Sequence, residues 1–236
     1  MKDIDYMAKL QNKLELIDYL SGFLTEDRIN KIKLVLNNRT RHFTAVLEDI
    51  YHAPNASAII RTCDCFGIQD LHIIENIKRN KVNKCVTQGS GKWISLHNYR
   101  DNSDNTLECI KRLKDQGYHI AATSLRDEND ISIDDIDINQ KTAICFGTEE
   151  TGLSDTAHEL ADSIVKIPMF GFTQSFNISV TAAICLHNLI KRVHKSDVKW
   201  QLNNDELIDF KLDWIMKSIK NVDMILKRYE RLNFEL

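Results

Sequence analysis

The chain contains little proline and glycine, and it has no long run of hydrophobic residues. Two prolines and eight glycines among 236 residues leave no segment with the composition of a long flexible linker. No stretch reaches the roughly 18 consecutive apolar residues that a membrane-spanning helix needs. The first ten residues, MKDIDYMAKL, lack the apolar core of a signal peptide. We therefore expect a folded, cytoplasmic protein with no membrane partner.

The cysteines argue against disulfides and against a metal site. All six are scattered through segments with a core-like composition, which is typical of reduced thiols in a cytosolic protein. Cys63 and Cys65 are close in sequence, but no cluster of His or Cys accompanies them. We expect no metal ion.

Charge is unevenly distributed, although the net charge is only −3. Residues 28–42 contain basic side chains and no acidic one, and residues 187–200 are also basic. Much of the acid lies elsewhere, notably in residues 126–138. Solvated helix faces produce such basic runs, and so do surfaces that contact nucleic-acid phosphates. The charge pattern alone leaves both interpretations open.

Hydrophobic periodicity predicts alternating strands and helices in most of the chain. Residues 7–20, 25–37 and 103–117 have helical spacing, and further helices are expected to begin near Asn55 and Asn177. Strands are expected at 43–50, 70–75, 93–96, 118–125, 141–147 and 163–169. This alternation predicts an α/β fold with a parallel sheet covered by helices on both faces.

The chain after residue 200 has helical spacing and no strand pattern. We expect its apolar face to pack on the body of the protein or on another subunit. The residues of that face are Trp214, Ile215, Ile219, Met224 and Ile225.

An arginine in an apolar setting marks the segment HAPNASAIIRTCDCFGI, residues 52–68. Asn55 has the character of a helix N-cap, and helix formers or core fillers follow it. Arg61 lies among residues that should face a core, where an unpaired charge is costly. Arg61 therefore either reaches solvent or points into a cavity built for it.

A glycine turn with two acids follows the strand expected at 141–147, in FGTEETGLSDTAHEL. Glu149 and Glu150 would lie at the sheet edge where open α/β sheets bind ligands. The segment is neither a Walker loop nor GxGxxG, and Ser154 or Asp155 is expected to cap a helix. A solvated surface turn is the competing interpretation.

The segment IPMFGFTQSFNISVTAAI, residues 167–184, combines a glycine loop with a helix start. Asn177 is a candidate N-cap. Three phenylalanines, Phe170, Phe172 and Phe176, would be unusual in a solvated loop, so we expect them to line a cavity or an interface.

These three segments resemble, in order and spacing, the motifs of the SpoU/TrmH branch of the SPOUT RNA methyltransferases. The resemblance extends from about residue 25 to the C-terminus, and the tRNA guanosine 2′-O-methyltransferases look most similar. It implies a parallel sheet with a deep trefoil knot in about residues 140–190 and a catalytic domain at 41–195. Helical extensions at 1–40, for RNA binding, and at 196–236 would flank that domain.

The resemblance also implies S-adenosyl-L-methionine as cofactor and a homodimer that completes each site. By position, the cofactor-binding residues would be Thr123, Ser124, Leu125, Gly147, Ile167, Met169, Ser175 and Phe176. Arg61 would act on the ribose 2′-hydroxyl, as general base or as a cation that stabilises the developing alkoxide. Deprotonating an arginine at neutral pH costs about 7 kcal/mol, which favours the cation. Asn55 and Asn177 would orient the ribose and Arg61, and Glu149 would brace the knot loop or Arg61.

The resemblance places RNA contacts on the basic segments, at Arg28, Lys31, Arg39, Arg41, Lys191 and Arg192. Lys31 replaces an arginine of the family, so bidentate phosphate binding is not expected there.

The implied reaction is methylation of a tRNA ribose, at the D-loop guanosine (tRNA position 18). Ribosomal RNA or another tRNA nucleotide is an alternative substrate, although few residues precede the core for a separate rRNA-binding domain. A non-catalytic RNA-binding module is a different class of function, and the intact Asn55, Arg61, Glu149 and Asn177 argue against it. A dinucleotide-dependent oxidoreductase is disfavoured because the dinucleotide-binding loop is missing.

Overall fold

The computed structural model describes residues 2–77, 89–124 and 130–234. Contacts divide them into two compact units. One unit comprises the described residues of 39–201, and the other comprises 2–38 together with 202–234. The segments expected as two separate extensions therefore belong to one unit.

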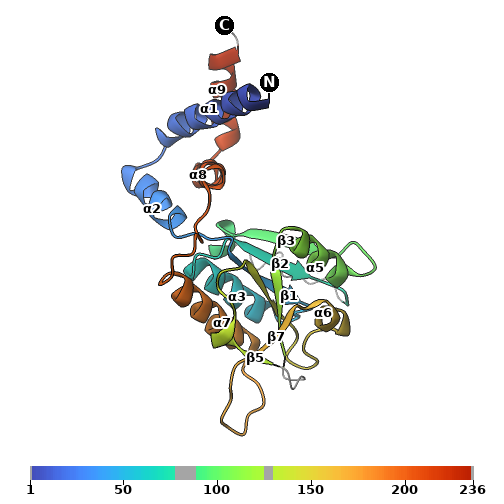
Figure 1. Ribbon diagram of the computed structural model, residues 1–236. Coiled ribbons are helices and arrows are strands. Elements are labelled where there is room, and N and C mark those ends of the chain that lie inside the picture. The colour runs from blue at the N-terminus through green and yellow to red at the C-terminus, as the bar shows by residue number, and fades with distance from the viewer. Residues whose placement is uncertain (1, 78–88, 125–129, 235–236) are drawn as a thin grey trace. The chain divides into compact units, whose positions relative to one another are not determined.

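A seven-stranded sheet with parallel pairing is the centre of residues 39–201 (Figure 1). Its spatial order is β3-β2-β1-β6-β4-β7-β5. The strands are β1 Phe43–Glu48, β2 Asp70–Ile74, β3 Ser95–Tyr99, β4 His119–Thr123, β5 Ile131–Ser132, β6 Thr142–Phe146 and β7 Ser163–Lys166. The predicted parallel α/β sheet is confirmed.

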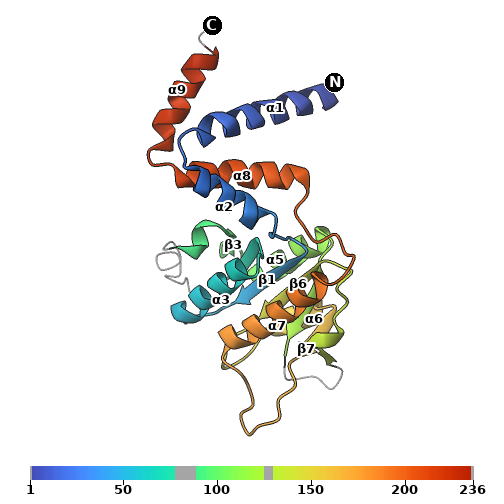
Figure 2. The same cartoon turned by 90° about the vertical axis from the view of Figure 1, so that its left-hand side faces the viewer.

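Helices cover both faces of this sheet (Figure 2). They are α3 Ala53–Cys65, α5 Asn105–Asp115, α6 Asp155–Leu160 and α7 Ile178–Val193, with 3₁₀ turns at Ser90–Lys92 and Ile133–Asp135. Helices α3 and α7 pack on one face, where Ala45 and Leu47 of β1 point. Helices α5 and α6 pack on the other face with Val46, as the two-residue period of a strand requires.

The sheet differs from the predicted strands most clearly in two places. The strand expected at 93–96 begins later, at Ser95, and pairs with β2 through residue 99. The two-residue strand β5 lies in the acidic segment, where no strand was predicted, and is held by pairing with β7. The helix stop predicted at Gly117 is confirmed, because Gly117 adopts φ +81° after α5.

The second unit consists of four helices. They are α1 Lys2–Ser21, α2 Glu26–Leu36, α8 Asn204–Ser218 and α9 Val222–Phe234. Helix α8 packs against α1 and α2 and buries Trp214 and Ile215. The rings of Tyr19 and Tyr229, 4.9 Å apart, join α1 to α9. Of the apolar face predicted after residue 200, Trp214 and Ile215 are buried in this unit, whereas Met224 is 72% exposed.

An arginine expected at the RNA surface is instead buried. Arg39 has 0% exposure, forms an ion pair with Asp64 on α3, and donates from Nη1 to the Ile68 carbonyl at 3.2 Å. Burial lowers the pKa of Arg39, and the charge of Asp64 opposes that shift. The RNA-contact prediction for Arg39 is wrong because the buried side chain joins the segment before β1 to α3.

Removing the Asp64 carboxylate should strongly destabilise the unit formed by residues 39–201. Asp64→Asn removes the carboxylate charge that pairs with a buried guanidinium, and we expect a loss of about 3 kcal/mol in the free energy of unfolding. Urea denaturation followed by circular dichroism measures it. Lys114→Met is the control, because it breaks the more exposed pair with Asp162 and should cost less than about 1 kcal/mol. Equal losses in the two variants would contradict this role of Arg39.

Candidate active site

The loops after three neighbouring strands enclose a cavity of about 330 Å³. Because β4, β6 and β7 are parallel, their carboxyl ends lie at one edge of the sheet. The loops that follow them bring together residues 123 and 124 and parts of the segments 146–160 and 167–184. The predicted residues that line the cavity are Thr123, Ser124, Gly147, Ile167, Met169, Ser175 and Phe176; Leu125 lies outside the described residues. We call this space of about 330 Å³ the first cavity.

A tight turn after β6 forms one wall of the first cavity. Thr148 and Gly152 exchange two backbone hydrogen bonds of 3.0 and 3.1 Å, and Gly152 adopts φ +73°. A Cβ on Gly147 would lie 2.1 Å from the carbonyl carbon of Gly152. Only glycine fits at position 147, because the opposing atoms belong to the backbone.

A carboxylate from this turn gathers two asparagines. Glu149 Oε1 accepts from Asn177 Nδ2 at 2.6 Å and from Asn55 Nδ2 at 3.1 Å. It also accepts from the backbone N–H of Ile178 at 3.3 Å, at the N-terminus of α7, where a negative charge is favourable. Three of the four predicted catalytic residues therefore meet at the rim of the first cavity.

The N-cap prediction is wrong for Asn55 and confirmed for Asn177. Helix α3 begins at Ala53 after His52, with Pro54 in its first turn, so the amide of Asn55 is available to Glu149. Asn177 Oδ1 accepts from the Ser179 N–H at 2.9 Å, while its Nδ2 reaches Glu149. Ser154 caps α6, as one of the two predicted options.

Arg61 does not join this cluster in the single chain. It is exposed, it does not line the first cavity, and it has no hydrogen bond or ion pair with a described residue. At 100° per residue, Arg61 lies about 150° from the centre of the α3 face that buries Ala56, Ile59, Ile60 and Cys63. Of the two options that the sequence left open, the single chain shows the one in which Arg61 reaches solvent.

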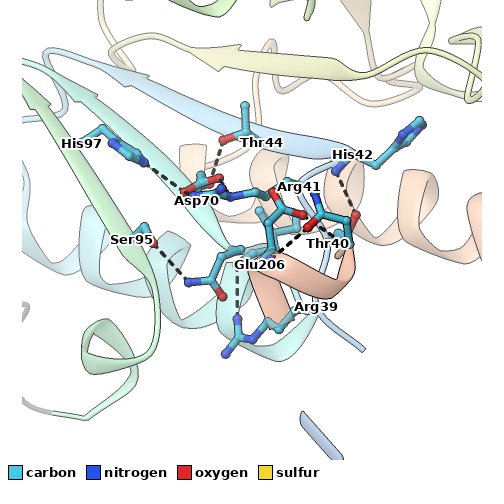
Figure 3. A network of polar contacts seen from close by, with 12 residues as sticks. Arg39, Thr40, Arg41, His42, Thr44, Asp70, Ser95, His97 and Glu206 are labelled. Atoms are coloured by element: carbon cyan, nitrogen blue, oxygen red, sulfur yellow. Dashed lines mark hydrogen bonds and ion pairs between the residues drawn. The ribbon is translucent and has the colours of Figure 1, made fainter. Parts of the chain in front are cut away.

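Arg41 is only partly available to a ligand. Its Nε lies 2.7 Å from Asp70 Oδ2, and His97 Nε2 lies 3.0 Å from Asp70 Oδ1, as Figure 3 shows. Burial alone would raise the pKa of Asp70, but the hydrogen bond from His97 and the charge of Arg41 hold it below its usual range. Asp70 offsets the positive charge of Arg41.

The other predicted RNA contacts fall into two groups. Arg28, Lys31 and Lys191 are exposed. Arg192 instead donates to the backbone carbonyls of Ile133 and Ile136, the first at 3.2 Å, and it anchors the segment after β5. Its predicted contact with RNA is therefore not supported, since these carbonyls hold the guanidinium.

A histidine that the sequence did not reveal also lines the first cavity. His158 lies one turn after the N-cap of α6, with Nδ1 2.9 Å from the Ser154 carbonyl. Because a carbonyl only accepts, Nδ1 carries the proton, and Nε2 can accept from Ser124 Oγ at 3.0 Å. His158 therefore positions Ser124. No motif in the sequence marks it.

The loop between β7 and α7 presents aromatic side chains to solvent. Phe176 lines the first cavity, whereas Phe170 and Phe172 are 98% and 110% exposed.

A membrane-spanning segment is not found among the helices of the described ranges, since none of them has the required length and apolar character. In the same ranges, no group of three or more potential metal ligands occurs.

Comparison with protein families finds a match over residues 42–187, to the SpoU rRNA Methylase family. A tRNA (guanosine(18)-2′-O)-methyltransferase of Borreliella burgdorferi is 44% identical over 90% of this chain and 95% of its own length. The enzyme of the same name from Thermus thermophilus is 37% identical over 69% of this chain and 81% of its own.

A solved structure is also similar. It is the A. aeolicus TrmH/SpoU tRNA modifying enzyme, with a TM-score of 0.71 and 27% sequence identity. The match covers 83% of this chain and 98% of that one, so it includes the sheet that carries the first cavity.

Replacing Gly147 should damage the wall of the first cavity. Gly147→Ala drives a Cβ into the backbone of Gly152, and we expect a loss of about 2 kcal/mol or more in stability. Gly171→Ala is the matched control, because its Cβ meets nothing closer than Thr173 N at 4.0 Å, and we expect a change of about 0.5 kcal/mol or less. Urea denaturation compares the two. A Gly147→Ala protein as stable as the control would contradict this packing.

Proposed function

This chain belongs to the SpoU rRNA methylase family, and from that premise we propose that it methylates a ribose 2′-hydroxyl of tRNA. The cofactor is S-adenosyl-L-methionine, and the target is guanosine 18. The observation that carries the proposal is the meeting of Asn55, Glu149 and Asn177 at the rim of a ligand-sized cavity. The name and near-complete overlap of the Borreliella relative favour tRNA over ribosomal RNA.

The lining of the first cavity fits S-adenosylmethionine. Ile167, Met169 and Phe176 supply apolar walls for an adenine ring, and the backbone of the 147–152 turn supplies polar groups for its edge. Glu149 and Glu150 add negative charge to the lining, which would favour a cationic sulfonium. When bound, the cofactor supplies an electrophilic methyl group.

The protein must orient and activate the sugar hydroxyl. We assign Asn55 and Asn177 to orienting the ribose, with Glu149 holding both amides in place. Arg61 stays cationic and stabilises negative charge that develops on the 2′-oxygen. This role needs a shielded guanidinium, because screening by water weakens the interaction.

A homodimer would provide the shielding that the single chain lacks. Arg61 is exposed, and so are Phe170 and Phe172. Exposed aromatic side chains are enriched in interfaces, and a second copy seated on them is consistent with the family. The deep trefoil knot in about residues 140–190, and the catalytic boundaries 41–195, stay predictions. Cytoplasmic localisation is likewise part of the proposal.

Nucleoside analysis tests the activity directly. Purified protein, S-adenosylmethionine and an unmodified tRNA transcript should yield 2′-O-methylguanosine at position 18, detected by mass spectrometry of nuclease fragments. Arg61→Ala should lower kcat by about 100-fold or more and leave cofactor affinity and the circular dichroism spectrum unchanged. A ribosomal RNA transcript is the competing substrate. Methylation of that RNA alone, or normal turnover by folded Arg61→Ala, would overturn the proposal.

The RNA contacts that we propose are those with exposed charge, mainly Arg28 and Lys31 on α2. If each neutralises one phosphate, substitution by Ala should reduce the slope of log K against log salt by about one. Filter binding of tRNA between low and moderate salt measures this slope. Lys111→Ala, an exposed lysine on α5, is the control. An unchanged slope in both α2 variants would exclude this surface.

A further inference from the structure

A second cavity lies on the other side of the 147–152 turn. It has a volume of about 310 Å³ and shares Thr148, Thr151 and Gly152 with the first cavity. The end of β1 and the segment after it contribute Glu48, Asp49 and Tyr51 to its wall. A nucleotide with its ribose near Glu149 could therefore place its base across the turn. We call this space the acidic cavity.

The charge of the acidic cavity disfavours the phosphate of an RNA nucleotide. Glu48, Asp49 and Asp155 line it, and no lysine or arginine is among the described lining residues. A phosphate would be repelled by these carboxylates. A neutral group rich in N–H donors would be attracted. The Watson–Crick edge of guanine has this character, because N1–H and N2–H₂ are adjacent donors, whereas adenine presents an acceptor at N1.

Two of the carboxylates retain capacity to accept hydrogen bonds from a ligand. Asp49 Oδ1 accepts from the N–H groups of Asn76 and Ile77, at 2.8 and 3.3 Å. Its Oδ2 has only a 3.5 Å contact, with Asn76 Nδ2, among the described residues. Glu48 Oε2 accepts one bond, from the Ser154 N–H at 2.8 Å. A carboxylate oxygen has two lone pairs, so each of these oxygens can accept another donor.

An aromatic ring stands beside these carboxylates. Tyr51 is 37% exposed, and its ring face is the kind of surface on which extruded RNA bases stack. Partial burial raises the pKa of Tyr51, and the charges of Asp49, Glu150 and Glu48 raise it further. The hydroxyl therefore lies within the field of the same carboxylates and stays protonated.

We propose that the acidic cavity receives the base of the target nucleotide, with Tyr51 stacking on the ring and Asp49 accepting from guanine N1–H and N2–H. This inference rests on the proposed methyl transfer to tRNA and adds the residues that select the base. It assigns guanine recognition to the end of β1, in a cavity that shares the 147–152 turn with the first cavity.

The backbone at Asp49 allows a conservative test. Asp49 adopts φ +51°, a conformation that asparagine tolerates well. In Asp49→Asn, the amide oxygen can still accept from the N–H groups of Asn76 and Ile77, so the local fold is preserved. The variant replaces Oδ2 by a donor, and that change removes the proposed partner of guanine. Asp115→Asn, at the exposed end of α5, is the control with the same charge change.

The decisive measurement is the ratio of kcat/KM for two tRNA transcripts that carry guanosine or inosine at position 18. Inosine lacks only the N2 amino group. We expect the wild type and Asp115→Asn to prefer guanosine by about tenfold, and Asp49→Asn to bring the ratio close to one. Tyr51→Ala should raise KM for tRNA by about tenfold, with partial recovery in Tyr51→Phe and no change in cofactor affinity by calorimetry.

The outcomes separate this inference from the function on which it rests. If the wild type transfers no methyl group to either tRNA, the proposed function fails. If it methylates tRNA but Asp49→Asn keeps the wild-type ratio, or the wild type shows no preference for guanosine, base selection by Asp49 is refuted. If Tyr51→Ala leaves KM unchanged, the stacking role is refuted.

Discussion

One carboxylate oxygen holds the active site together. Glu149 Oε1 accepts from Asn55 on α3 and from Asn177 and Ile178 at the start of α7. Three segments that are far apart in sequence therefore depend on a single charge. Bonds to an ionised acceptor are stronger than neutral ones, and the helix N-terminus adds to their stability. Glu149 is exposed, so its position is maintained by the turn that carries it. That turn exists only because Gly147 has no side chain.

The 147–152 turn also explains why the site lies at the carboxyl ends of the strands. Parallel strands place all their carboxyl ends together, and β6 lies between β1 and β4 in the sheet order. The segment after β6 can therefore reach the segment after β1 on one side and the loops after β4 and β7 on the other. The hydrogen-bonded cluster, the first cavity and the acidic cavity all adjoin this one connection.

Much of this arrangement could be predicted from local sequence, because it depends on local physics. The strand and helix order follows from hydrophobic period, and Ser154, Asn177 and Gly117 act as caps or stops for reasons within one helical turn. The grouping of the three motifs came from resemblance to a family. The short strand β5 could not be predicted, since two residues carry no periodic signal and its stability comes from β7.

The two arginines show where local reasoning fails. Arg61 has apolar neighbours in sequence and yet points to solvent, whereas Arg39 lies in a strongly basic segment and yet has 0% exposure. The difference between the two arginines lies in their tertiary contacts. Arg39 forms an ion pair with Asp64 and a hydrogen bond to the Ile68 carbonyl, and both partners are distant in sequence. Arg61 has no hydrogen bond or ion pair with a described residue. Burial of a charge is decided by the partners that the fold supplies, which a count of neighbouring apolar residues does not report.

The proposed substrate carries groups of different charge, and these groups suit different surfaces of the protein. Both cavities contain carboxylates, which suit a sulfonium and an N–H-rich base edge and repel phosphates. The phosphates must therefore be held elsewhere, by side chains whose charge is not neutralised within the protein. Arg39 and Arg41 are paired with Asp64 and Asp70, and so contribute little net charge. The exposed cations of α2 remain suited to that task, so a chain with net charge −3 can bind a polyanion while its cavities stay negative.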